Sequence, residues 1–414
     1  MNAPRPARAT HRVPAPDVAR GLMLWVIAVA NITVWIWAPG PTDGLRERTL
    51  GAGAGTAGWT ADDLVNMAMS MLVDGRGFPL FSFLVGYGVG QIAARESARG
   101  TPLPLAQQLL LRRYGWLLLL GALHACLLFP GDIITAYAFG GLFLALLITA
   151  STRTLAVLVG LGTVLMVLFG AAGWAARSPG TVRYPSLVAE SPQEWLALGL
   201  AEGTAVVILA PIQLLGLLPM MLLGLALSRY RLLEAPGPRR TRLLGTAVIC
   251  IVPGLATGTG TGLLTTDMLE PSAAAGAALA GADAVTGAAQ GIGYAIVVAL
   301  VCARVQGRGG DAAAPLRARE HPALWSLQAL GRRSMSGYLA QSLLFTVLLP
   351  PFALGLGRSL TPTAALLLGT AVWVLTLLGA ALLERRTLPG PAEAVHRRLY
   401  LGTARGGAGP RPPV

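Results

Sequence analysis

The chain has 414 residues, of which 54% are hydrophobic and 12% charged, and its mean hydropathy is +0.62. Soluble domains carry roughly 25% charged residues, so this composition excludes an ordinary water-soluble fold. All 32 basic residues are Arg, and the net charge is +13. These residues lie in short clusters between apolar blocks, where the positive-inside rule explains them without a nucleic-acid partner.

The apolar blocks are about 20 residues long, which is the length that an α-helix needs to cross ~30 Å of hydrocarbon. We therefore predict an all-α transmembrane bundle of about ten helices, with both termini in the cytoplasm. One domain over 18–400 is expected, between disordered tails at 1–17 and 401–414. The predicted spans are 18–38, 78–94, 109–129, 132–150, a span ending near 174, 211–228, 243–264, 285–302, 336–354 and 363–383.

Two shorter segments, 62–73 and 195–210, are predicted to lie in or near the outer interface because a complete span follows each. The loop 265–283 is net acidic and is expected outside, together with its last residue, Asp283. An even number of crossings places every dense Arg cluster on the opposite side, which supports the count.

Each of the three cysteines, Cys126, Cys250 and Cys302, lies inside an apolar block. Their spacing suggests neither a zinc site nor a disulfide framework, and buried thiols behave as small hydrophobes. We predict that they are structural and that the chain holds no metal.

Ionisable residues at membrane depth are costly and usually face a cavity, so the few present are the natural site candidates. His124 follows Arg113 by 11 residues, which places it roughly 16 Å into the membrane by helical rise. Asp132 opens the next span. His124 could act as a general base or acyl acceptor that Asp132 orients. Alternatively, Asp132 is only a helix cap and His124 a hydrogen-bonded packing residue.

A second candidate pair, Asp74 and Arg76, lies between glycines at the start of the 78–94 span. It could line the same pocket, or form a local ion pair at a kink. Other polar residues inside spans are most simply interhelical hydrogen-bonding groups. These residues are Asn31, Gln213, Tyr338, Gln341 and Ser342.

Several stretches resemble the YeiB-like bacterial membrane proteins that carry domain of unknown function 418. D-V-A-R-G at 17–21 with Asn31 is similar to that family's opening of helix 1. The segments 74–86, 112–113, 121–125, 131–138, 331–332, 338–342 and 390–393 resemble its later motifs. Arg76 stands where the family usually has Lys, which keeps the charge but changes the donor geometry. The usual Trp near Glu393 is missing.

The family is distantly similar to the transmembrane acyltransferases, which share the R-G…N opening and use cytoplasmic acyl-CoA. In the heparan-alpha-glucosaminide enzyme the catalytic His precedes the second helix, whereas 51–59 of this chain contains no His. The resemblance thus implies an acyltransferase-like protein in which His124 and Asp132 work near the outer face. Predicted substrate-binding residues are Asp74, Arg76, Asn31, Tyr137 and Gln341.

Arg112 and Arg113 are the predicted partners of the phosphates of acyl-CoA, a co-substrate; no tightly bound cofactor is expected. Expected partners are the lipid bilayer of the bacterial inner or plasma membrane and a small-molecule or glycan acceptor. Whether the chain forms a homodimer is left open.

Two other functions are left open by the sequence. One is a small-metabolite transporter or exporter, for which paired broken helices are expected. The other is a non-catalytic scaffold.

Overall fold

The computed structural model describes residues 13–36, 59–175, 184–234, 239–266, 268–269, 271–306 and 316–402. Residues 1–12 and 403–414, which make up most of the predicted tails, lie outside these ranges. The segments 37–58 and 307–315 also lie outside them. Every regular element among the described residues is helical. The elements are α1 (Pro14–Ile32), η1 (Thr33–Trp35), α2 (Ala61–Leu72), α3 (Gly77–Ala98), α4 (Leu103–Leu127), α5 (Ile134–Leu146), α6 (Thr152–Ala175), η2 (Pro185–Val188), α7 (Pro192–Ser228), α8 (Arg240–Thr265), α9 (Ala273–Gln306), α10 (Pro322–Arg332), α11 (Ser334–Leu348), η5 (Leu356–Arg358), α12 (Pro362–Arg385) and α13 (Pro391–Leu401).

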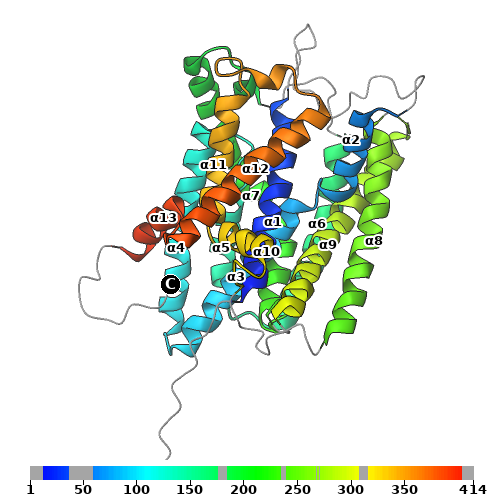
Figure 1. Ribbon diagram of the computed structural model, residues 1–414. Coiled ribbons are helices and arrows are strands. Elements are labelled where there is room, and N and C mark those ends of the chain that lie inside the picture. Colours follow the sequence, from blue (N-terminus) through cyan, green and yellow to red (C-terminus); the bar gives the residue numbers. More distant parts are fainter. Residues whose placement is uncertain are drawn as a thin grey trace, which may run out of the picture.

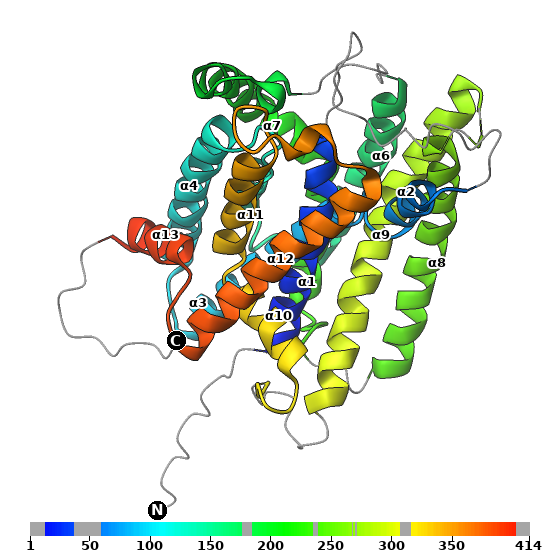
Figure 2. The ribbon, with the colours of Figure 1, turned by 45° about the horizontal axis from the view of Figure 1, so that its top comes forward.

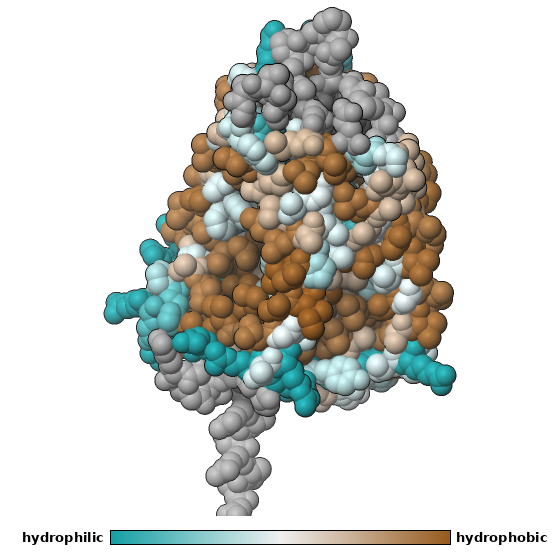
Figure 3. All heavy atoms as spheres, turned by 90° about the vertical axis from the view of Figure 1, so that its right-hand side faces the viewer, coloured by the Kyte–Doolittle hydropathy of each residue, from teal (hydrophilic) through white to brown (hydrophobic). Residues whose placement is uncertain are grey.

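The helices form a bundle with α1 at its centre, α12 across α1, and α8 and α9 side by side at one edge (Figures 1 and 2). An apolar belt covers the face seen in Figure 3, with hydrophilic side chains along its lower edge. Exposed apolar side chains on α8 include Ile249, Val252 and Val248. Large apolar side chains that point outward require lipid as the surrounding solvent.

Seven helical segments of the described chain are long and apolar enough to cross a membrane. They are Pro14–Trp35, Ala61–Ala98, Thr152–Ala175, Pro192–Ser228, Arg240–Leu264, Ala273–Gln306 and Pro362–Arg385. The chain is therefore a multi-pass membrane protein, as predicted. The helices α5 and α11 have only 13 and 15 residues, or roughly 20 Å each, which is short of a full crossing. The count of ten crossings and the orientation of the termini stay predictions.

Besides shifts of a few residues at helix ends, two features differ from the predictions. The segments 195–210 and 211–228 form one helix, α7, which continues through Pro211. The helix is held at two close approaches, where Gly203 meets the α4 backbone at Cys126 and Gly224 meets the Phe83 carbonyl. Neighbouring helices of this kind sustain a helix through proline. The first helix begins at Pro14, four residues before the predicted start.

The second difference concerns α9, which begins at Ala273 and includes Asp283. The expectation that Asp283 belongs to an outer loop was therefore wrong. The first turns of α9 are rich in Ala and Gly and low in bulky apolar residues. This composition is typical of a loop, so the sequence did not indicate a helix there. Ala is the best helix former, so the backbone folds as helix once α8 covers it.

The helix α2, predicted to lie in or near the outer interface, packs lengthwise against α8. Gly262 and Gly258 of α8 meet Met67 and Met71 of α2 in turn, so the two helices run antiparallel in contact. Small residues spaced by four allow backbones to approach this closely. The break that follows α2 therefore lies inside the bundle.

The central helix α1 is fixed to α10 by two glycines of the recognised motifs. A Cβ at Gly21 would lie 2.1 Å from the Leu327 carbonyl oxygen, and one at Gly331 would lie 1.7 Å from that of Asp17. Arg332 then reaches Asp17 at 3.8 Å and Glu384 of α12 at 2.7 Å. Motifs more than 300 positions apart thus form one contact.

We expect Gly21→Ala and Gly331→Ala each to destabilise the protein by about 1–3 kcal/mol or more, because the obstacle is backbone that cannot rotate away. Thermal unfolding in detergent measures the effect. Gly115→Ala and Gly160→Ala are matched controls, since nothing lies within 4 Å of a Cβ at either position, and they should leave the midpoint unchanged or raise it. Equal midpoints for both sets would contradict the packing account.

Candidate functional site

The centre of the site is a buried pair formed by His124, in the last turns of α4, and Asp132, in the turn before α5. His124 Nδ1 lies 2.7 Å from Asp132 Oδ1, and the side chains are 1% and 0% exposed. An ionised carboxylate only accepts hydrogen bonds, so we assign the proton to Nδ1, which leaves Nε2 as an acceptor. The structure brings these two predicted residues together.

Asp132 has two hydrogen-bond partners, so it fills both roles considered for it, that of a helix cap and that of the carboxylate beside His124. Its Oδ2 atom accepts a hydrogen bond of 2.7 Å from the backbone N–H of Thr135, in the first turn of α5. The same carboxylate is therefore a helix cap and the partner of His124. The close approach depends on Gly121 of α4, where a Cβ would lie 2.7 Å from Thr135 N. The cap holds the carboxylate in place against the imidazole.

Ser342 of α11 completes the arrangement, and the sequence reading gave it only a packing role. Its Oγ atom lies 2.8 Å from His124 Nε2, and the residue is 3% exposed. With Nδ1 protonated, the serine hydroxyl donates to Nε2. The available signal was the four-residue spacing of Tyr338, Ser342 and Thr346, which places three polar groups on one helix face. The sequence gave no indication that this face of α11 contacts α4.

Aromatic rings enclose the imidazole. The ring of Tyr338 lies 4.9 Å from that of His124, and the ring of Phe129 lies 6.5 Å away at its edge. Phe129 in turn stacks on Trp35 at 5.4 Å. These rings exclude water from the pair, which strengthens hydrogen bonds and electrostatic interactions within the site.

The five predicted substrate-binding residues do not lie together. Tyr137 lies near Asp132 and Asn31 beside Tyr338, whereas Gln341 contacts α12, and Asp74 and Arg76 belong to the cluster around Asp283. The phenol of Tyr338 faces the amide of Asn31, and Tyr137 lies near Asp132 and donates a hydrogen bond of 3.0 Å to the Phe78 carbonyl. The side chain of Gln341 instead donates to Thr376 of α12 at 3.4 Å. Gln341 therefore belongs to the α11–α12 contact.

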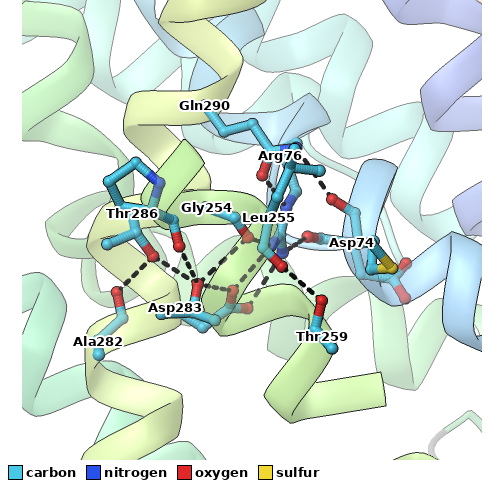
Figure 4. Close-up of polar contacts among 12 residues, drawn as sticks. Asp74, Arg76, Gly254, Leu255, Thr259, Ala282, Asp283, Thr286 and Gln290 are labelled. Carbon is cyan, nitrogen blue, oxygen red and sulfur yellow. Dashed lines mark hydrogen bonds and ion pairs between the residues drawn. The ribbon is translucent and has the colours of Figure 1, made fainter. Parts of the chain in front are cut away.

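A second polar cluster surrounds Arg76, which is fully buried at the break between α2 and α3 (Figure 4). Its carboxylate partner is Asp283 of α9, with Nη2–Oδ1 and Nη1–Oδ2 distances of 2.8 and 3.1 Å. The remaining N–H groups donate to Gln290 Oε1 at 3.0 Å, the Gly254 carbonyl at 2.7 Å and the Asp74 carbonyl. All five donors of the guanidinium are thus used within the protein. A substrate would have to replace one of these acceptors.

The Arg76 cluster also satisfies the backbone at the helix break. The last carbonyls of α2 have no partner within their own helix. Gln290 Nε2 donates to the Met71 carbonyl at 2.9 Å, and the Tyr294 hydroxyl donates to that of Leu72 at 3.2 Å. Irregular backbone inside a membrane bundle is tolerated only when such partners exist. The positive charge of Arg76 is also favourable at the negative end of the α2 dipole.

The predicted acyl-CoA phosphate partners, Arg112 and Arg113, lie far down α4 from His124, beside α13. Arg112 is exposed, whereas Arg113 is half-buried with its guanidinium 5.4 Å from the centre of the Tyr400 ring. His396 Nε2 donates to the Arg113 carbonyl at 2.8 Å. This contact docks α13 onto α4.

We expect the docking of α13 to weaken in acid. Burial lowers the pKa of His396 below its ordinary value of about 6.5. The docked helix therefore favours neutral His396, and its stability is complete above that ordinary pKa and declines as pH falls toward the lowered value. Hydrogen exchange of 391–401 should be slower at pH 7.5 than at pH 5.5 after correction for intrinsic rates. His396→Gln should remove the difference, and equal protection in the wild type would refute the prediction.

The described residues contain no group of three or more His, Cys, Asp or Glu side chains placed to hold a metal ion. The three cysteines are free thiols. At the His124 site, the contacts with Asp132 and Ser342 place an oriented base beside a hydroxyl, which suits proton transfer and nucleophilic chemistry.

Comparison with known proteins confirms the resemblance inferred from the motifs. The model of the family described as "Protein of unknown function (DUF418)" matches residues 227–403. This region contains the motifs at 331–332, 338–342 and 390–393. The chain is also similar to the protein named "Uncharacterized protein YxaH" of Bacillus subtilis (strain 168), with 29% identity over 156 residues. That match spans 37% of each of the two chains.

Proposed function

We propose that this protein is a membrane-bound acyltransferase that moves an acyl group from cytoplasmic acyl-CoA to an acceptor at the outer face. The observation that carries the proposal is the His124–Asp132 pair. The second ring nitrogen of His124, Nε2, lies 2.8 Å from the Ser342 hydroxyl. A buried imidazole oriented by a carboxylate is the usual means of deprotonating an acceptor hydroxyl or amine.

The positions of the Arg residues support the proposed entry of the donor. The eleven positions between Arg113 and His124 correspond to roughly 16 Å of rise along α4. An acyl-CoA with its phosphates at Arg112 and Arg113 could extend its pantetheine arm along this helix. Tyr137, near Asp132, and Asn31, beside Tyr338, would contact the acceptor.

Isothermal titration of acetyl-CoA and palmitoyl-CoA into the detergent-purified protein tests the proposal. We expect saturable binding that weakens in the double variant Arg112→Ala/Arg113→Ala and persists in His124→Ala. The variant Arg239→Ala/Arg240→Ala, in a cluster at the start of α8, is a charge-matched control that should bind like the wild type. Folded wild-type protein that binds neither thioester would refute the acyltransferase proposal.

One observation favours a second candidate, a small-metabolite transporter. The Arg76–Asp283 pair lies at a broken helix inside the bundle, which is where transporters place substrate and ion sites. Transporters of this kind usually pair two broken helices, and α7 runs unbroken through its prolines. Failure to bind acyl-CoA, together with binding of a small metabolite that Asp283→Asn abolishes, would favour transport.

A further inference from the structure

We propose that Ser342 is the nucleophile of this site and carries the acyl group as an ester between donor and acceptor. The inference rests on the proposed acyl transfer and adds a covalent step to it. It follows from the environment of the Ser342 hydroxyl, which meets an imidazole, whereas the hydroxyls of Ser82 and Thr346 donate back along their own helices.

A serine or threonine inside a helix ordinarily donates back to the carbonyl four residues earlier. Ser82 of α3 does so, with its Oγ 2.9 Å from the Phe78 carbonyl. Thr346 does the same on α11, one turn after Ser342, at 2.9 Å. Ser342 has its Oγ on His124 Nε2 instead. Its hydroxyl is therefore directed across the helix interface at a base.

Three separate parts of the chain hold the components in line. Asp132 is fixed by the Thr135 N–H, His124 is fixed by Asp132 and by the ring of Tyr338, and Ser342 is fixed on the rigid α11. The two links measure 2.7 and 2.8 Å, within the reach required between an orienting carboxylate, a base and a nucleophile. The same order of groups defines serine nucleophiles on unrelated folds, where geometry and not sequence position identifies them.

The two half-reactions balance without any further reagent. In the first, Ser342 Oγ attacks the thioester carbonyl, His124 Nε2 takes the hydroxyl proton, the C–S bond breaks, and the proton passes to the departing CoA thiolate. In the second, His124 takes a proton from the acceptor hydroxyl or amine, which attacks the ester. The ester C–O bond breaks and the proton returns to Ser342 Oγ. Asp132 stabilises the imidazolium in both steps.

A covalent carrier also suits the proposed transfer from a cytoplasmic donor to an acceptor at the outer face. CoA can leave before the acceptor enters, so the two substrates need not occupy the buried site together. The kinetics should therefore be of the ping-pong kind.

The test is peptide mass spectrometry of detergent-purified protein incubated with acetyl-CoA or palmitoyl-CoA without acceptor, then quenched in acid. We expect an ester on Ser342 in the wild type, removable by hydroxylamine. Ser342→Ala should carry no ester and should release CoA about 10³-fold more slowly while still binding acyl-CoA. Thr346→Ala, on the same helix face, is the matched control and should be esterified on Ser342 like the wild type.

Three results would overturn the inference alone. Two of them are an acyl group on another residue such as His124, and release of CoA by Ser342→Ala within about twofold of the wild type. Wild-type protein that releases CoA without forming any ester would also overturn it. Failure of the proposed function is distinguishable, because folded wild-type protein would then neither bind acyl-CoA nor release CoA.

Discussion

Replacing Asp132 with Asn is expected to lower the rate of acyl transfer by about 10²–10⁴-fold. An amide in place of the carboxylate removes the charge that stabilises the His124 imidazolium, and it can donate to Nδ1 and so favour the wrong tautomer. Release of CoA from acetyl-CoA or palmitoyl-CoA measures the rate.

The stability of the same variant separates a chemical role from a structural one. An Asn oxygen can still accept the Thr135 N–H, so the melting temperature should change little. Glu202→Gln is the matched control, because Glu202 caps η2 through Ser186 N at 3.0 Å and lies outside the pair. It should keep the wild-type rate. An Asp132→Asn variant as active as the wild type would remove the orienting role of the carboxylate.

The largest effect on stability is expected at the Arg76 cluster. Asp283→Ala leaves a fully buried guanidinium without its counter-charge, and a loss of about 3–5 kcal/mol in the free energy of unfolding follows. Denaturant or thermal unfolding in detergent measures this loss. The double variant Arg76→Met/Asp283→Leu removes both charges and should recover much of it.

The exposed ion pair Arg317–Glu320 provides the control for this prediction. Its side chains are 75% and 56% exposed, so Glu320→Ala should change stability by no more than about 0.5 kcal/mol. A loss below about 1 kcal/mol for Asp283→Ala would show that the Arg76 charge is compensated by its carbonyl contacts alone.

Features set by local sequence were predictable. Apolar blocks of membrane-spanning length gave the helical membrane class, and α3, α4 and α12 contain the predicted spans or most of them. His124 and Asp132 could be paired because only eight positions and a Pro-Gly turn separate them. Short loop closure leaves few ways to arrange such neighbours.

Features set by contacts between distant segments were not predictable. Ser342 meets His124 across 218 positions, and Asp283 meets Arg76 across 207. Periodicity describes one helix at a time, so it cannot show which helix faces which. The start of α9 was missed for a different reason, since its Ala- and Gly-rich turns have the composition of a loop and become helix through packing.

Whether His124 acts as the base of an acyl transfer can be measured as CoA release from acetyl-CoA and palmitoyl-CoA by purified wild-type protein and by His124→Ala in proteoliposomes. We expect saturable release by the wild type and a loss of about 10²-fold or more in His124→Ala, with both proteins showing the same melting temperature. Equal rates for the two proteins, or no release by folded wild type, would contradict it.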